Sequence, residues 1–184
     1  MKKYFMILLT ITSFLQVIQA QKQIIKKNGK EYHRDARLND YIGTWNWVDN
    51  NNIFKLVFVP RRVIAGDYGM DIVKGYYSYT VNDSLITNTI STMEPDNPEE
   101  KNSFSYMEHR GENILMINFW DAEYGKYGTA RMTFLNGGDK TKAKWTLGRY
   151  EREQLLFIPD VSTYVEPPEG FSVPTEMILE KVEE

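Results

Sequence analysis

The stretch KYGTARMTFLNGGDKTKAKWTLG, residues 126–148, decides the fold class of this chain. Two runs of alternating side chains, 126–135 and 141–148, flank the turn sequence Asn-Gly-Gly-Asp at 136–139. A glycine-rich turn between two alternating runs is a strong short-range signal of a β-hairpin, because glycine accepts the positive φ angles of tight turns. The stretch therefore predicts two antiparallel strands joined by a tight turn.

Similar runs recur on both sides of this hairpin, at 42–48, 53–59, 70–81, 84–91, 103–109, 114–120 and 175–182. Pro60 is expected to end the second run, leaving 61–69 as a loop, and Asn82-Asp83 is a natural hairpin turn. No window has the sustained period of about 3.6 residues that predicts a helix. With about nine strands joined mostly by tight turns, we expect an all-β fold, an antiparallel meander closing into a lipocalin-like (calycin-type) barrel of about 8–9 strands. An open two-sheet sandwich is the alternative.

One face of each predicted strand collects the bulky apolar side chains. The sets that share a face are Trp45 with Trp47; Phe54, Leu56 and Phe58; Leu115, Ile117 and Phe119; Met132 with Phe134; and Trp145 with Leu147. Pointing inward, they would mostly fill a barrel of about eight strands. Gly128, Ala130 and Ala143 belong to the same sets and are expected to leave a limited pocket near one end. Arg131 has the opposite parity and is expected to point to solvent.

The first residues have the pattern of a secretory signal peptide. Lys2 and Lys3 precede an almost uninterrupted apolar run, 4–15, and Ala20 is a small residue after which a signal peptidase can cleave. The apolar run is shorter than the roughly 20 residues that a membrane-spanning helix needs. A cleaved leader is therefore the preferred interpretation.

Three segments follow from this reading of the chain. Residues 1–20 are expected to be the signal peptide, 21–40 a polar N-terminal arm with at most one short strand, and 41–184 a single β-barrel domain. The arm is assigned on its polar composition and on the turn signal Asn28-Gly29-Lys30. The strand pattern begins only at Tyr41.

Composition bounds the location and the partners of the mature chain. The sequence has 22 basic and 25 acidic residues, and loss of Lys2 and Lys3 with the leader leaves 20 basic residues and a net charge of −5. This balance gives no electrostatic reason to bind nucleic acid. The absence of cysteine excludes disulfides and the thioether lipid anchor of exported lipoproteins. We expect an exported, soluble protein, periplasmic or extracellular, with no membrane span after cleavage.

The residue types that carry metal or thiol chemistry are sparse. The two histidines, His33 and His109, have no further ligands at the spacing of a zinc site. The acidic stretch 94–100 lacks the alternating ligands and central glycine of an EF-hand calcium loop. From these patterns the sequence predicts no metal, no cofactor and no catalytic residue.

Asp121 and Glu123 follow the strand that ends in Phe119-Trp120. Two carboxylates beside aromatic rings are what glycoside hydrolysis uses, because sugars stack on rings while the carboxyl groups act as acid and base. Acidic residues after a strand are more often part of a simple surface loop.

The leading hypothesis is therefore a non-catalytic binding or interaction module, for either a small apolar ligand or an envelope protein. A carbohydrate-acting hydrolase that uses Asp121 and Glu123 is the alternative.

The run Gly43-Thr44-Trp45 resembles the Gly-x-Trp motif that opens the barrel of lipocalins and fatty-acid-binding proteins. More of the chain resembles domain-of-unknown-function family 6705, small exported bacterial proteins. The similar features are the leader, the Gly43-Thr44-Trp45 strand, the run 54–59, and the proline-bearing tail 166–175 that precedes Met177-Ile178-Leu179-Glu180-Lys181. The resemblance implies a lipocalin-like β fold and no assigned activity. Because the C-terminal helix and the second motif of true lipocalins are missing, only the barrel is carried over.

Overall fold

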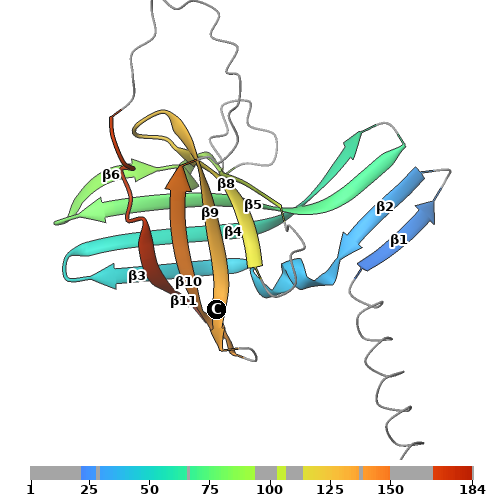
Figure 1. Ribbon diagram of the computed structural model, residues 1–184, viewed down its shortest axis with the longest axis horizontal. Coiled ribbons are helices and arrows are strands. Elements are labelled where there is room, and N and C mark those ends of the chain that lie inside the picture. The colour runs from blue at the N-terminus through green and yellow to red at the C-terminus, as the bar shows by residue number, and fades with distance from the viewer. Residues whose placement is uncertain are drawn as a thin grey trace, which may run out of the picture. The chain divides into compact units, whose positions relative to one another are not determined.

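The computed structural model describes residues 22–27, 30–65, 67–93, 103–106, 114–136, 139–149 and 168–183 (Figure 1). The chain divides into two compact units. The arm unit comprises Met1–Asp40 and Pro60–Ile72, and the barrel unit comprises Tyr41–Val59 and Val73–Glu184. Two long strands, β4 (Asn52–Ala65) and β5 (Tyr68–Val81), contribute residues to both units.

The barrel unit is built from eight strands in one hydrogen-bonded order, β5-β4-β3-β11-β10-β9-β8-β7. The strands not yet given bounds are β3 (Gly43–Asp49), β7 (Ser103–Tyr106), β8 (Ile114–Asp121), β9 (Lys126–Asn136), β10 (Asp139–Arg149) and β11 (Glu176–Lys181). A three-residue antiparallel ladder between β5 and β7 joins the two ends of this order. The predicted all-β, antiparallel, lipocalin-like barrel is thus confirmed.

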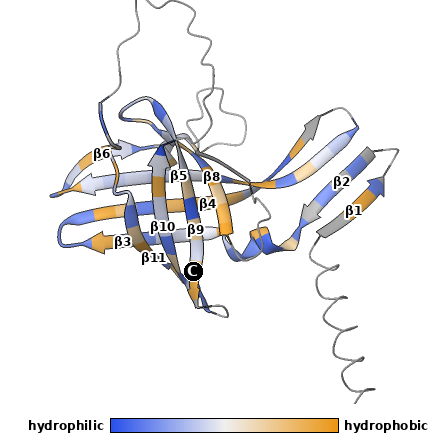
Figure 2. Ribbon diagram, in the orientation of Figure 1, coloured by the Kyte–Doolittle hydropathy of each residue, from blue (hydrophilic) through white to orange (hydrophobic). Residues whose placement is uncertain are grey.

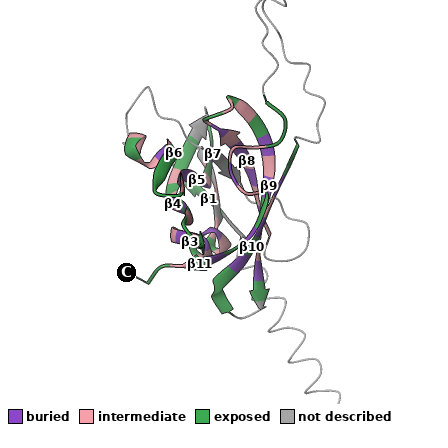
Figure 3. Ribbon diagram, turned by 90° about the vertical axis from the view of Figure 1, so that its left-hand side faces the viewer, coloured by how far each residue is buried: buried purple, intermediate pink, exposed green. Residues whose placement is uncertain are grey.

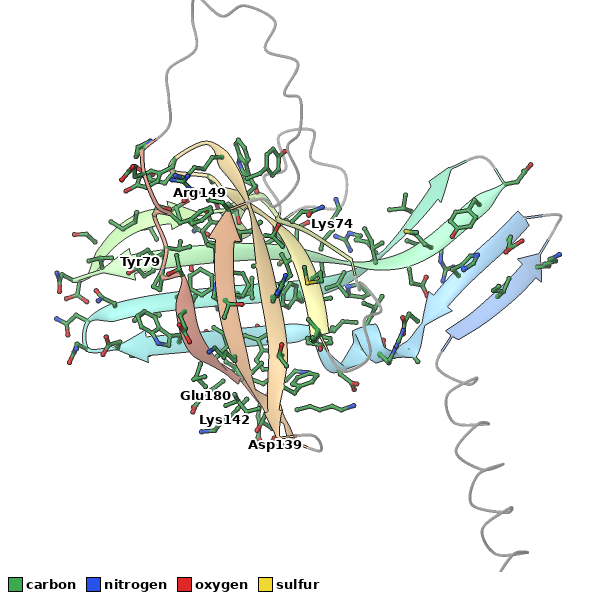
Figure 4. All side chains as sticks on the ribbon, in the orientation of Figure 1. Lys74, Tyr79, Asp139, Lys142, Arg149 and Glu180 are labelled. Carbon is green, nitrogen blue, oxygen red and sulfur yellow. The ribbon has the colours of Figure 1, made fainter. Side chains whose placement is uncertain are left out.

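β11 completes the barrel by lying between β3 and β10 (Figure 1). Met177 and Leu179 of β11 pair with Trp145 and Ala143 of β10, and Lys181 pairs with Trp45 of β3. On the outer face of the β10–β11 ladder, Lys142 forms an ion pair with Glu180 at 2.5 Å (Figure 4). Lys144 forms a second ion pair with Glu176, also at 2.5 Å. Hydrogen bonding to Glu180 raises the pKa of Lys142.

The predicted antiparallel meander has one departure, at β6 (Ser84–Asn88). This strand pairs with β5 over Ser78–Val81 but lies off the main strand order, and β7 pairs with β5 over Val73–Gly75. β5 has 14 residues, which is long enough to pair with β6 and β7 one after the other. The strand predicted over 84–91 stops at Asn88 because the 3₁₀ helix η2 (Ile90–Thr92) turns the chain.

The interior of the barrel unit consists of the apolar faces predicted from alternation (Figure 3). Trp45, Phe54, Phe119 and Trp145 are each 0% exposed, and β8 alternates without interruption between half-buried and buried positions. The ring of Trp145 lies 5.8 Å from that of Phe54 and 5.7 Å from that of Phe119. The rings therefore meet across the interior, as the predicted inward sets require. Trp47, near the end of β3, is only half-buried.

The arm unit is a four-stranded sheet. β1 (Lys22–Lys27) pairs antiparallel with β2 (Lys30–Asp35), and β2 pairs in parallel with β5 from Glu31↔Tyr68 to His33↔Met70. The segment 60–65 of β4 is the fourth strand, and the 3₁₀ helix η1 (Ala36–Asp40) follows β2. Two strands thus form where at most one short strand was expected.

The expectation that Pro60 ends a strand and begins a loop over 61–69 was also wrong. β4 continues through Pro60 to Ala65. Its ladder with β3 ends at the pair Gly43↔Phe58, so Pro60 lies where β4 has no partner on that side. A proline is tolerated at such an edge because its missing N–H interrupts no ladder.

Several sequence-based expectations concern residues outside the described parts of the chain. They are the signal peptide 1–20, the acidic stretch 94–100 and His109. Within the described residues, no helix has the length and the apolar composition needed to cross a bilayer.

Candidate functional site

The structure gives the two predicted carboxylates different environments. Asp121, the last residue of β8, is 0% exposed, and Glu123 in the following turn is exposed. Oδ1 of Asp121 accepts hydrogen bonds from the backbone N–H groups of Glu123 and Tyr124, each at 3.1 Å, and from Oγ of Ser172 at 2.6 Å. Oδ2 accepts from the backbone N–H of Ser172 at 2.7 Å. Asp121 thus satisfies four donors and anchors two segments that lie 51 residues apart.

The segment anchored by Asp121 is termed the strap, residues 168–175. It precedes β11, and Thr175 accepts a hydrogen bond through its carbonyl oxygen from the Leu147 N–H at 2.7 Å. Lys126 donates to the Pro168 carbonyl oxygen, and its Nζ lies 5.2 Å from the centre of the Phe171 ring. The strap is therefore held by contacts with β8, β9 and β10.

Phe171 of the strap occupies the space that the small residue Gly128 leaves on β9. A Cβ added at Gly128 would lie 2.5 Å from Cζ of Phe171, far inside van der Waals contact. The Phe171 ring also meets Phe119 edge to face at 6.5 Å. A limited pocket was expected around Gly128. The space beside Gly128 is instead filled by the side chain of Phe171.

Tyr77 of β5 lies beside the same turn. Its hydroxyl accepts a hydrogen bond from the backbone N–H of Ala122 at 2.9 Å, and its ring contacts Phe119 at 4.8 Å. Burial raises the pKa of Tyr77 far above its ordinary value, and the negative charge of Asp121 adds to this increase. Tyr77 is therefore a neutral phenol that, like Asp121, fixes the β8–β9 turn.

One polar atom of the barrel interior stands out. Nε1 of Trp145 is buried and has no hydrogen-bond partner among the described residues. By contrast, Nε1 of Trp45 donates to the carbonyl oxygen of Tyr41 at 2.8 Å. A buried donor without an acceptor costs free energy, so such an atom calls for a structural or functional reason.

Apolar residues occur along the strands of both units (Figure 2). Among the described residues, eight exposed large apolar side chains lie in the barrel unit, including Val48 and Leu85. Five lie in the arm unit: Ile24 (59% exposed), Ile25 (36%), Val63 (39%), Tyr68 (44%) and Met70 (38%). The register places Ile24, His33 and Met70 in one row across three strands, and therefore on one face of the sheet. Ile25 lies on the opposite face because successive side chains alternate. Apolar side chains thus reach solvent on both faces of a single layer.

Charge also separates the two units. Residues 21–40 and 60–72 of the arm unit carry eight basic and five acidic residues, whereas the barrel unit carries twelve basic and twenty acidic residues. Four of the arm lysines, Lys22, Lys26, Lys27 and Lys30, lie on the β1–β2 hairpin. The arm unit is therefore a basic part of an acidic chain.

The remaining candidate residues give no chemical centre. His33 is half-buried, its Nε2 lies 3.1 Å from Oε1 of Glu31, and its ring lies 4.8 Å from that of Tyr68. Among the described residues, no three His, Cys, Asp or Glu side chains are grouped so as to hold a metal ion. Arg131 is exposed, as its parity predicts.

Fold and surfaces together define a small antiparallel β-barrel protein with a second, open-sheet unit. The chain matches the family model described as Family of unknown function (DUF6705) over residues 1–182. It belongs to this family, which confirms the resemblance seen in the sequence. No curated protein and no solved structure gives a significant match to the chain.

Proposed function

We propose that this protein is an exported, non-catalytic interaction module of the bacterial envelope or secretome that binds a protein partner through the sheet of the arm unit. The observation that carries the proposal is the exposure of apolar side chains on both faces of this sheet. A sheet is stable when at least one apolar face is covered by a second layer. Exposed apolar groups that are gathered together mark interaction sites on soluble proteins.

The packing of the barrel unit supports a site on the arm unit in preference to one inside the barrel. Bulky rings, including those of Trp45, Phe54 and Trp145, fill the interior. The hollow beside Gly128 holds Phe171. A small-ligand site is typically a preformed cavity of about 300–1,000 Å³ lined by such groups rather than filled by them.

The geometry at Asp121 supports an anchoring role in preference to the hydrolase alternative. Acid–base catalysis on a sugar needs two carboxyl groups that both reach the substrate. Asp121 is buried, and its two oxygens accept four hydrogen bonds. Glu123 is exposed, so this turn offers a substrate one accessible carboxylate and not two. The proposed module is therefore non-catalytic.

A second candidate function is suggested by Trp145 alone. An apolar molecule with one hydrogen-bond acceptor would satisfy Nε1 of Trp145 if it entered the barrel interior. Native mass spectrometry of the protein isolated from its own host tests this candidate. An added mass that is lost from a Trp145→Phe variant would support it, and an unliganded mass would contradict it.

Methionine oxidation gives a direct test of the arm-unit site. Met70 is 38% exposed on the arm sheet, while Met132 (0%) and Met177 (4%) are buried in the barrel unit and serve as internal controls. We expect hydrogen peroxide to oxidise Met70 more slowly in a host envelope or medium extract than in buffer, because a partner covers it. A Tyr68→Ser variant should lose this protection. Equal oxidation of Met70 in both media would contradict the proposal.

Mass spectrometry of the intact protein from its host tests the signal peptide. We expect a mass that corresponds to a chain beginning at Gln21, and the mass of the uncleaved chain would contradict cleavage after Ala20.

A further inference from the structure

Resting on the proposed function of the arm unit, we infer that its partner is an acidic, extended polypeptide segment that adds as a strand to the outer edge of β1. Strand addition requires an edge whose backbone groups are unpaired. Among the described residues, β1 is hydrogen-bonded to β2 alone and ends the strand order on its side. This edge belongs wholly to the arm unit.

The backbone geometry of β1 follows from its hairpin. Only two residues connect β1 to β2, and the flanking pair Lys27↔Lys30 closes the ladder. In a two-residue hairpin the flanking pair exchanges both hydrogen bonds, and bonded and non-bonded pairs then alternate. The N–H and C=O groups of Lys22, Ile24 and Lys26 therefore point away from β2. They form a ready row of donors and acceptors for one further strand.

Charge selects the kind of strand. Residues 21–30 contain four lysines and no acidic residue. Opposite charges on neighbouring strands stabilise a ladder, so carboxylates on an added strand would complement this basic segment. Lysines on an edge also repel an identical edge, which disfavours pairing of β1 with β1 of a second copy. The edge is thus selective for a segment rich in Asp or Glu.

The apolar side chains complete the recognition. Ile24 lies in one row with His33 and Met70 on one face of the arm sheet, and Ile25 lies on the other face. An added strand would place its own side chains beside Ile24 and Ile25 on alternate faces. The preferred segment therefore combines acidic residues with β-branched residues, which favour strands.

The test uses fluorescence anisotropy of the mature full chain, residues 21–184, with a labelled peptide of alternating glutamate and valine. A lysine–valine peptide of equal length is the charge-reversed control. The critical variants are Ile24→Pro, which removes an N–H from the outer edge, and Ile24→Ala, which keeps it. We expect Ile24→Pro to weaken binding by about tenfold or more, whereas Ile24→Ala weakens it by less than about threefold. The double variant Lys22→Gln/Lys26→Gln should bind more weakly and with less dependence on salt.

Circular dichroism and thermal melting of each variant establish that the barrel unit remains folded. Equal binding by Ile24→Pro and Ile24→Ala would overturn the inference, as would equal affinity for the two peptides. Binding of anionic phosphatidylglycerol vesicles that competes with the peptide and is unaffected by Ile24→Pro would overturn it in favour of a lipid surface. If Met70 stays protected in extract for the Ile24→Pro variant, the partner lies on the sheet face, and the proposed function survives while this inference fails. If Met70 of the wild type is never protected, the proposed function itself fails.

Discussion

β8 of the barrel unit and β1 of the arm unit show what separates the two parts of this molecule. β8 alternates regularly between half-buried and buried residues, and its buried residues include Leu115 and Phe119. β1 carries Ile24 and Ile25 side by side, and both reach solvent. In both strands, successive side chains alternate between the two faces of the sheet. The comparison teaches that burial depends on the neighbours that a strand finds. In the barrel unit the curled sheet covers its own inner face, whereas in the described part of the arm unit Ile24 and Ile25 reach solvent on opposite faces of the sheet.

The largest expected effect sharpens this comparison at the centre of the barrel. Trp45→Ala should lower the free energy of unfolding by about 3–5 kcal/mol, because it empties a fully buried site and removes the bond from Nε1 to the Tyr41 carbonyl. Val48→Ala on the same strand, at a position 62% exposed, should stay within about 0.5 kcal/mol of wild type. Urea denaturation followed by tryptophan fluorescence measures both. Similar effects of the two variants would mean that β3 has no inner face.

The next effect concerns the anchor of the strap. Asp121→Ala should cost about 2–4 kcal/mol because it leaves the donors of Ser172, Glu123 and Tyr124 without their acceptor. Glu123→Gln, in the same turn but exposed, is the matched control and should change the stability by less than about 0.5 kcal/mol. Thermal melting compares the two. A cost at Glu123 as large as at Asp121 would remove the distinction between an anchoring and a surface carboxylate.

A smaller effect probes how tightly the strap closes on β9. Gly128→Ala should cost about 1–3 kcal/mol, because the new methyl group would overlap the ring of Phe171 and approach the Gly148 carbonyl oxygen. Combined with Phe171→Ala, it should cost less than the sum of the two single changes, since the overlap with the ring is gone. Gly148→Ala is the control, because nothing lies within 4 Å of its added Cβ. Strict additivity of Gly128→Ala and Phe171→Ala in chemical denaturation would contradict this packing.

The smallest effect is expected in the arm unit. Ile24→Ser should change the stability of the isolated protein by less than about 0.5 kcal/mol, and Met70→Ser by less than about 1 kcal/mol, because Ile24 is 59% exposed and Met70 is 38% exposed. Differential scanning calorimetry of the purified protein checks this. A loss of more than about 1 kcal/mol for either variant would show that the arm sheet is covered in solution, and the contrast with the barrel unit would disappear.

The sequence predicted the parts of the fold that depend on local pattern. Alternation placed Phe54, Leu56 and Phe58 inside, and the Asn-Gly-Gly-Asp turn identified the β9–β10 hairpin. It failed where tertiary context decides, as at Pro60, which is harmless because β3 no longer accompanies β4 there. Residues 22–30 contain four lysines and the pair Ile24-Ile25, a composition typical of an edge strand. Because the segment was assigned from its polar composition alone, this signal was missed.

The candidate sites were less predictable. Asp121 was singled out as a carboxylate beside aromatic rings, but its role depends on Ser172, which is 51 residues away and lies in a tail whose sequence gives no sign of a contact with Asp121. Likewise, nothing in the local sequence indicates that Phe171 fills the space at Gly128. Contacts between remote loops follow from the closed sheet and not from spacing along the chain.

The insertion of β11 between β3 and β10 has a consequence for biosynthesis. β3 begins at Gly43, whereas its partner begins at Glu176, so the ribosome must add more than a hundred residues before this seam can form. Until then, β3 and β10 each present an unsatisfied ladder, and the nascent polypeptide is vulnerable to mispairing and aggregation. Such a long-range closure step makes slow, post-translational folding the expected route for this protein.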